Sequence, residues 1–142
     1  MADPYDLDRF IAAQSTTFDQ ALRELAAGAK RSHWMWFVFP QCAGLGSSDM
    51  ARRYGISSLD EARAFLRHPV LGHRLRLCTA AVNAVSGRTA HDIFGSPDDM
   101  KFRSSMTLFS RADPSIPEFG TALTTYFAGE EDARTLEILS QG

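Results

Sequence analysis

Apolar residues recur at intervals of three and four along most of the chain, which is the spacing of one face of an α-helix. Residues that start or stop helices separate these runs. The start signals are Asp3-Pro4, Thr16, Ser58 with Glu61, Pro69, Ser96-Pro97 and Ile116-Pro117, and the stop signals are Gly28, Gly87 and Gly129. The pattern therefore predicts a series of short and medium helices.

The longest apolar stripe lies in the middle of the chain and predicts the central helix. It consists of Val70, Leu71, Leu75, Cys78, Val82 and Val85. No two alternating runs flank an Asn-Gly or Asp-Gly turn, so a sheet has no evident partner strands. The sequence predicts an all-α fold: a single irregular multihelical domain over residues 1–142, with about eight to ten helices.

Composition agrees with one folded domain. At 142 residues, with 44% hydrophobic and 23% charged residues, the chain can bury one core. Fifteen Lys and Arg against seventeen Asp and Glu leave a net charge of -2. Because no positive field is available to hold a phosphate backbone, we expect no nonspecific nucleic-acid binding.

Targeting and metal signals are missing from the sequence. The N-terminus lacks a basic leader with an apolar stretch, and the longest apolar run, residues 34–39, is too short for a membrane span. We therefore expect a cytoplasmic protein without membrane contact, with Cys42 and Cys78 as reduced core thiols. Histidines 68, 73 and 91 have no Cys or carboxylate at ligand spacing, so we expect no metal and predict no cofactor.

Residues 32–41 form the most unusual segment, because both tryptophans of the chain lie within it. An element that is apolar on all sides must be enclosed by protein, so one interpretation is core filling, as a helix or as a buried strand. The other is a pocket wall, in which Trp34 or Trp36 stacks on a flat ligand while His33 and Gln41 supply polar contacts. His33 is also a candidate general acid or base.

Residues 92–109 hold the second candidate. At helical pitch the apolar arc consists of Met100, Phe102, Met106, Leu108 and Phe109. Lys101, Ser104 and Ser105 fall inside this arc and need partners, since an unpaired buried polar group is costly. The partner is either internal, a carbonyl of the preceding turn or water reached by a long lysine stem, or an external anion that Lys101, Ser104, Ser105 and Arg103 bind together.

Several long motifs in one order give the chain a family resemblance. They are KRSHWMWFVFPQ at residues 30–41, GLGSS at 44–48, ARRY at 51–54, HPVLG at 68–72 and DIFGSPDDMKFRSSMTLF at 92–109. Through them the chain resembles a bacterial domain family of unknown function that is often mislabelled calpastatin. The resemblance implies an all-helical fold and brings no established activity. Calpastatin itself is a disordered inhibitor, whereas this composition predicts a compact core.

Two hypotheses for function remain from the sequence. In the first, the domain binds or processes an anionic small molecule such as a nucleotide or an ADP-ribose-like ligand. His33 and Lys101 are then the candidate catalytic groups, and Trp34, Trp36, Gln41, Lys101, Arg103, Ser104 and Ser105 are the candidate ligand-binding residues. In the second, the domain is a noncatalytic protein-interaction module with an unknown protein partner. The first hypothesis predicts a convergent polar pocket, and the second a sizeable apolar surface patch.

Overall fold

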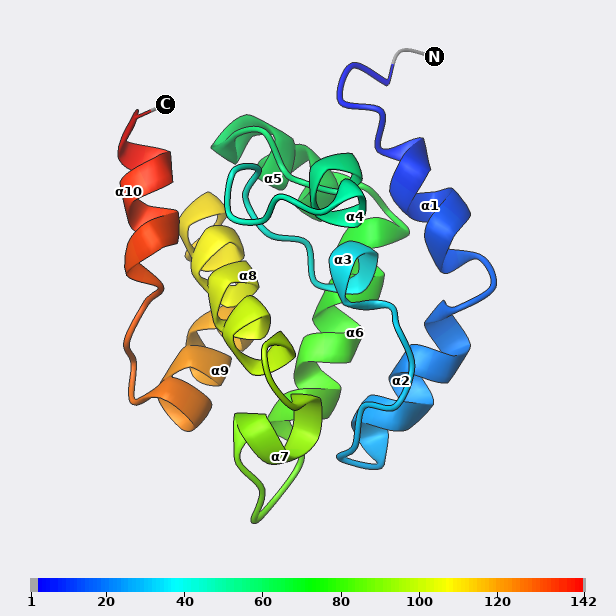
Figure 1. Cartoon of the computed structure of the whole chain (residues 1–142), viewed down its shortest axis with the longest axis vertical. Helices are drawn as coiled ribbons and strands as arrows, with labels where there is room; N and C mark the ends of the chain where they lie inside the picture. The colour runs from blue at the N-terminus through cyan, green and yellow to red at the C-terminus, as the bar shows by residue number, and fades with distance from the viewer. Residues whose placement is uncertain (1–2, 142) are drawn as a thin grey trace.

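Ten α-helices account for most of the chain in the computed structural model, which describes residues 3–141 (Figure 1). They are α1 (Asp8–Gln14), α2 (Phe18–Ala26), α3 (Met35–Val38), α4 (Asp49–Arg53), α5 (Leu59–Arg67), α6 (Leu71–Asn83), α7 (Ala90–Phe94), α8 (Asp98–Ala112), α9 (Pro117–Phe127) and α10 (Ala133–Gln141). Within the described residues there is no named strand, only one isolated bridge between Cys42 and Ile56. The prediction of an all-α domain with eight to ten helices is confirmed.

Side-chain caps explain where several helices begin. The Asp3 carboxylate accepts hydrogen bonds from the backbone N–H groups of Leu7 and Asp8, at 2.8 and 3.0 Å, just ahead of α1. Ser58 caps α5, as the sequence predicts. The capping box of α7, Thr89 with Asp92, was not predicted. Helix α8 starts at the Ser96-Pro97 signal, but the N-terminal cap that the sequence assigns to Ser96 is wrong, since the N-cap is Pro97, which has no side-chain acceptor.

The central position predicted for the long apolar stripe is confirmed by α6. This helix runs through the middle of the molecule and contacts α2, α3, α5 and α9 (Figure 1). Helix α8 packs against α5, α7, α9 and α10. Among residues 3–141, no helix is both long enough and apolar enough to span a membrane.

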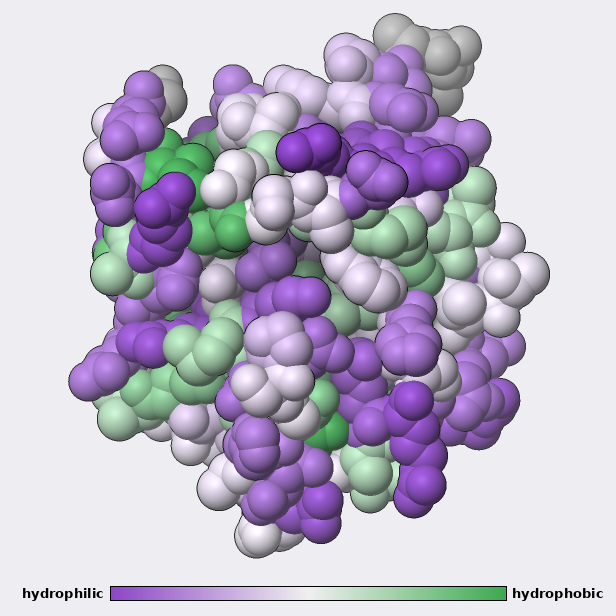
Figure 2. Space-filling model, viewed as in Figure 1, coloured by the Kyte–Doolittle hydropathy of each residue, from purple (hydrophilic) through white to green (hydrophobic). Residues whose placement is uncertain are grey.

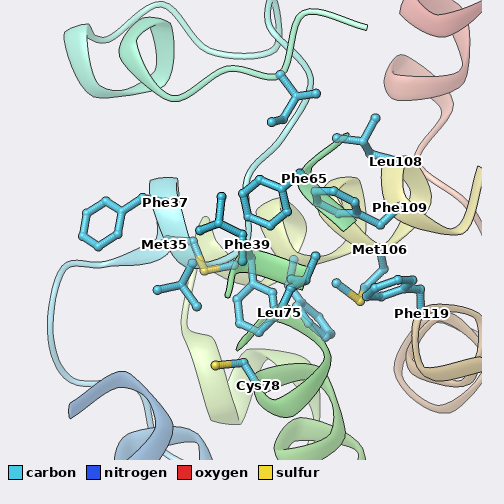
Figure 3. Close-up of a cluster of buried hydrophobic side chains, with 14 of the residues drawn as sticks. Met35, Phe37, Phe39, Phe65, Leu75, Cys78, Met106, Leu108, Phe109 and Phe119 are labelled. Atoms are coloured by element: carbon cyan, nitrogen blue, oxygen red, sulfur yellow. The ribbon is translucent and has the colours of Figure 1, made fainter. Parts of the chain in front are cut away.

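Aromatic side chains from distant segments fill the core between α6 and α8 (Figure 3). The Phe102 ring stacks on Phe94 at 4.6 Å and meets Phe39 edge-on at 5.0 Å, which joins α8 to the 34–39 segment. Each such side chain contributes roughly 2–3 kcal/mol through burial. The core interpretation of residues 34–39 therefore holds for most of the segment. Met100, which we expected in the apolar arc, is instead 45% exposed.

Two helical glycines offer a matched test of the packing. A Cβ added at Gly72 would lie 2.0 Å from the carbonyl oxygen of Leu66, whereas one at Gly120 would meet nothing within 4 Å. We expect Gly72→Ala to lower the free energy of unfolding by about 2 kcal/mol or more through overpacking. Gly120→Ala should raise it by about 0.5–1 kcal/mol through helix propensity. Urea unfolding of both variants measures this, and equal effects would contradict the described α5–α6 junction.

Candidate functional site

The segment from residue 29 to residue 58 contains only two short helices, α3 and α4. Backbone N–H and C=O groups outside regular structure still need partners when they are buried. Buried polar side chains of three neighbouring helices supply them here: Gln14 from α1, Glu24 from α2 and Glu61 from α5. Specific hydrogen bonds therefore fix the irregular segment to α1, α2 and α5.

Glu24 makes the most of these bonds. Its carboxylate is 4% exposed and accepts the backbone N–H groups of Arg31 and Ser32, at 2.8 and 2.9 Å, and the indole N–H of Trp34 at 3.0 Å. The Ser32 hydroxyl and the Gln20 amide also donate to it. Burial raises the pKa of this carboxyl, but the hydrogen bonds from Ser32, Arg31 and Gln20 outweigh burial and hold the pKa well below the ordinary 4.5.

Glu61 and Gln14 hold the rest of the segment. The Glu61 carboxylate accepts the Ser57 N–H at 2.9 Å and pairs with Arg9 at 2.9 Å, while the Gln14 amide donates to the Phe37 carbonyl at 2.8 Å. A backbone pair closes the loop, because Ile56 N–H donates to the Gln41 carbonyl at 2.8 Å. As a result residues 34–41 are fixed from both sides.

Both lysines of the chain lie beside one carboxylate, that of Asp98 in the first turn of α8. Lys30 Nζ is 2.8 Å from Asp98 Oδ2, and its side chain is 7% exposed. Lys101 Nζ is 3.6 Å from Asp98 Oδ1, and its side chain is 28% exposed. Each ammonium lies over one of the two indole rings, Lys30 at 5.0 Å from Trp34 and Lys101 at 5.3 Å from Trp36, within the range of cation–π attraction.

Lys101 and its neighbours form an open polar face. Its ammonium donates no hydrogen bond to another part of residues 3–141, and neither does the side-chain amide of Gln41. Trp36 is half-buried and, with Gln41 and Tyr54, lines a hollow of about 10 Å³, enough for one water molecule. We call Trp36, Gln41, Tyr54 and Lys101 the Trp36 face. Figure 2 looks onto α3 and α8 and shows a recess between them near its centre.

Other candidate residues have partners within the chain. The Arg103 guanidinium donates to the backbone carbonyls of Glu130 and Glu131, at 2.9 and 3.1 Å, and anchors the turn before α10. The Ser104 hydroxyl donates back to the Met100 carbonyl at 3.1 Å, which is the internal partner that the sequence allows. Trp34 is 1% exposed and belongs to the core.

Two candidates stand apart from these contacts. His33 is exposed and makes no hydrogen bond to the rest of residues 3–141. Ser105 is fully buried, and its hydroxyl has no partner in the described part of the chain. It lies one helical turn beyond Lys101 on the same face of α8. The structure thus places Gln41 and Lys101 each beside Trp36, and it does not gather all the candidate residues around one pocket.

Sequence reasoning missed three residues of this region: Lys30, Asp98 and Tyr54. A count of the lysines was the available signal. With only two in the chain, one in the 30–41 motif and one in the 92–109 motif, their meeting at Asp98 could have been tested as a hypothesis. Tyr54 gave no signal, because its place in the hollow depends on the loop closure at residue 56.

Larger concavities lie elsewhere, and two of them, of about 450 and 280 Å³, are lined by the exposed Arg67, which makes no hydrogen bond or ion pair within residues 3–141. Another, of about 790 Å³, lies between the end of α8 and α9, where two of the three guanidinium nitrogens of Arg111 donate to Glu131 at 2.7 and 2.8 Å. Burial raises the pKa of Cys42 to about 11 and that of Cys78 to about 12, so neither thiol is a ready nucleophile. Among the described residues, no three His, Cys, Asp or Glu side chains are grouped to hold a metal ion.

Comparison with known proteins places the chain in a family. Residues 4–139 match the model of the DUF1810 family, whose description is "Protein of unknown function". The chain therefore belongs to this family, and the resemblance found in its motifs is confirmed.

Among solved structures, the chain is similar to the conserved hypothetical protein Rv1873 from Mycobacterium tuberculosis. The two share 55% sequence identity with a TM-score of 0.96, over 97% of this chain and 99% of the other. A comparison with curated proteins found no match. The comparisons thus give a family and a fold, and the activity has to be argued from the site.

The Glu24 hydrogen bonds lead to a stability prediction. Because its pKa is lower in the folded than in the unfolded chain, Glu24 stabilises the fold fully above about pH 4.5, and the contribution is lost as the pH falls below that value. We expect Glu24→Gln to lower the free energy of unfolding by about 3 kcal/mol at neutral pH, since buried donors lose their acceptor.

The same variant should show a smaller difference from wild type at about pH 3, where part of the contribution is already lost. Urea unfolding at the two pH values measures both effects. Glu137→Gln is the matched control, because Glu137 is exposed on α10 and its carboxylate accepts no hydrogen bond within residues 3–141. A Glu24 variant as stable as this control would overturn the assigned anchor.

Proposed function

We propose that this chain is a cytoplasmic domain that binds an anionic small molecule, a nucleotide or an ADP-ribose-like ligand, at the Trp36 face. The observation that carries the proposal is the Lys101 ammonium, which lies 5.3 Å from the Trp36 ring and donates no hydrogen bond within residues 3–141. An ammonium carries three donors, and Asp98 lies at 3.6 Å, outside hydrogen-bonding distance. An anionic ligand group would satisfy these donors.

The neighbouring groups fit the remainder of such a ligand. The half-buried Trp36 ring offers a flat apolar surface on which a base can stack. The side-chain amide of Gln41 has both a donor and an acceptor for the edge of a ring or for ribose hydroxyls. Because the hollow itself is small, the ligand would lie across the face rather than enter a cavity, and we expect weak affinity.

A protein-interaction module is the second candidate, and one observation favours it. An apolar groove of about 230 Å³ runs beside α10, lined by Ile56, Leu59, Ile138 and Leu139. Figure 2 shows an apolar patch next to α10 on this side of the molecule. The exposed large apolar residues of the described chain, Val70, Leu77 and Met100, are by contrast scattered over α6, the turn before it, and α8. No Lys or Arg side chain lines this groove, so the two functions depend on different residues.

A ligand screen tests the proposed function. Binding of ADP-ribose, NAD, AMP or ATP at millimolar concentration should raise the melting temperature, by the free energy RT ln(1 + [L]/Kd). It should also change the fluorescence of the half-buried Trp36. We expect Lys101→Met to weaken binding at least tenfold, since a hydrogen bond to a charged group contributes about 1.5–3 kcal/mol.

Two further variants sharpen the screen. Trp36→Phe should remove the fluorescence change, because the buried Trp34 then remains as the sole indole. Arg134→Met removes one positive charge from an exposed site on α10 and should leave binding unchanged. If none of the four ligands stabilises the wild-type protein, or if Lys101→Met binds as well as wild type, the proposed function fails and the interaction module stands.

A further inference from the structure

A concavity of about 450 Å³ lies where α5 ends and α6 begins, and none of its lining residues belongs to the Trp36 face. We call it the Arg67 concavity. Pockets that hold small molecules have volumes of about 300–1,000 Å³, so this one has room for a small ligand. Part of its wall is fixed by close packing of the backbone, since a Cβ on Gly72 would lie 2.0 Å from the Leu66 carbonyl oxygen.

An uncommitted guanidinium lines this concavity. The Arg67 side chain is exposed and makes no hydrogen bond or ion pair within residues 3–141. Arg76, which also lines the concavity, is by contrast bound to both carboxylate oxygens of Glu118, at 2.7 and 3.1 Å. A guanidinium presents its N–H donors in a planar fork that matches the two oxygens of a carboxylate. Arg67 is therefore the arginine that can bind a carboxylate of a ligand here.

His68 provides a second donor. Its Nδ1 accepts hydrogen bonds from the backbone N–H groups of Val70 and Leu71, at 3.2 and 3.3 Å. Because a ring nitrogen that accepts carries no proton, the neutral ring has its proton on Nε2. His68 lines the concavity, and its Nε2–H has no partner within residues 3–141. The start of α6 thus fixes an imidazole donor one residue along the chain from the free guanidinium.

The carboxylates near this point are already engaged. Glu118 is neutralised by its ion pair with Arg76. Asp113 lines the adjoining concavity of about 280 Å³, which Arg67 also lines, and it accepts the Ser115 N–H and hydroxyl at 3.1 and 2.6 Å. These hydrogen bonds, and to a smaller extent the charge of Arg67, lower the pKa of Asp113, so its negative charge persists and weakens the attraction of an anion. We therefore expect millimolar affinity.

Apolar side chains also line the Arg67 concavity. Leu77 on α6 is 39% exposed and is one of three large apolar residues that are exposed in the described chain. Leu66 and Pro69 line the concavity with it, and among the described residues no Phe, Tyr or Trp does so. A ligand that covers Leu77 gains from the removal of apolar surface from water. The concavity therefore favours an aliphatic ligand over a flat ring that has to stack.

We infer that the Arg67 concavity is a binding site for a small aliphatic carboxylate. The carboxylate binds the Arg67 guanidinium and the His68 Nε2–H, and the aliphatic part covers Leu77. The site shares no residue with the Trp36 face or with the groove beside α10. It is therefore independent of the proposed function and of the interaction module.

Matched ligands test the charge and the aliphatic part separately on the wild-type protein. Isocaproate has a carboxylate on a branched aliphatic chain, isocaproamide has nearly the same shape without the charge, and acetate has the charge without the chain. NMR titration of the backbone amides at neutral pH follows all three. We expect isocaproate to shift the amides of residues 66–77 with a millimolar Kd. The other two should bind at least fivefold more weakly, since each lacks one of the two contributions.

Substitution of Arg67 should remove most of this binding. Arg67→Met keeps a long side chain and removes the donors, so isocaproate should bind at least fivefold more weakly. Arg134→Met removes the same charge from an exposed site on α10 and should leave the affinity unchanged. Lys101→Met should also leave it unchanged, because the Trp36 face is a different site.

The inference is overturned if isocaproate shifts no amide of residues 66–77, or if isocaproamide or acetate binds as tightly as isocaproate. Wild-type affinity in Arg67→Met would overturn it as well. Shifts centred on residues 34–41 and 101 would place the carboxylate at the Trp36 face and would also refute it. The comparison of the three ligands on the wild-type protein decides even if Arg67→Met does not fold. A negative nucleotide screen leaves this inference in place, because the two sites share no residue.

Discussion

The carboxylate of Glu24 is the constraint on which the arrangement of the Trp36 face depends. The chain between α2 and α5 has little regular structure, so its backbone groups cannot satisfy one another. Glu24 accepts five hydrogen bonds, from Gln20, the Arg31 N–H, the Ser32 N–H and hydroxyl, and the Trp34 indole. One buried charge thereby fixes the backbone at residues 31–32 and the ring of Trp34. Because that charge is stabilised by donors rather than by a single cation, removing any one donor leaves the others in place.

A series of side-chain contacts connects Trp34 to the rest of the site. Lys30 lies over the Trp34 ring and binds Asp98, which joins the segment after α2 to the start of α8. Helix α8 then places Lys101 one turn further along, over the second indole. Each lysine is thus paired with one tryptophan, and Asp98 lies between the two pairs. The Lys30 pair is buried, and the Lys101 pair, with a lysine side chain that is 28% exposed, is the one to which the proposed function assigns the ligand.

The sequence predicts the helices well, because caps and apolar spacing act locally. The α5 cap at Ser58, the central α6 stripe and the start of α9 at Pro117 follow from a few neighbouring residues. Met100 shows the limit of this reasoning. The helical wheel groups it with the apolar arc, but no element covers that edge of α8, so the side chain is 45% exposed. The coverage of a helix face depends on tertiary packing that no local pattern contains.

The candidate site was only partly predictable for a related reason. Trp36, Gln41 and Lys101 could be named because aromatic and polar residues among apolar neighbours are visible in the sequence. In the sequence, Arg103 and Ser104 are candidates of the same kind as Lys101. Only the structure shows that they have partners within the chain: the turn before α10 for Arg103 and the Met100 carbonyl for Ser104. Lys30 and Asp98 are 68 residues apart, and neither has a local feature that marks the other as its partner.

A shallow face can still bind selectively if its side chains are already ordered. Trp36 lies between the buried residues Met35 and Phe37 on α3, and residue 41 is tied to Ile56 through its backbone. A ligand therefore does not have to order these groups again, which removes one of the main costs of association. On the proposed function, the hollow is too small to select a ligand by its shape, so the Trp36 face can distinguish ligands mainly by their charge.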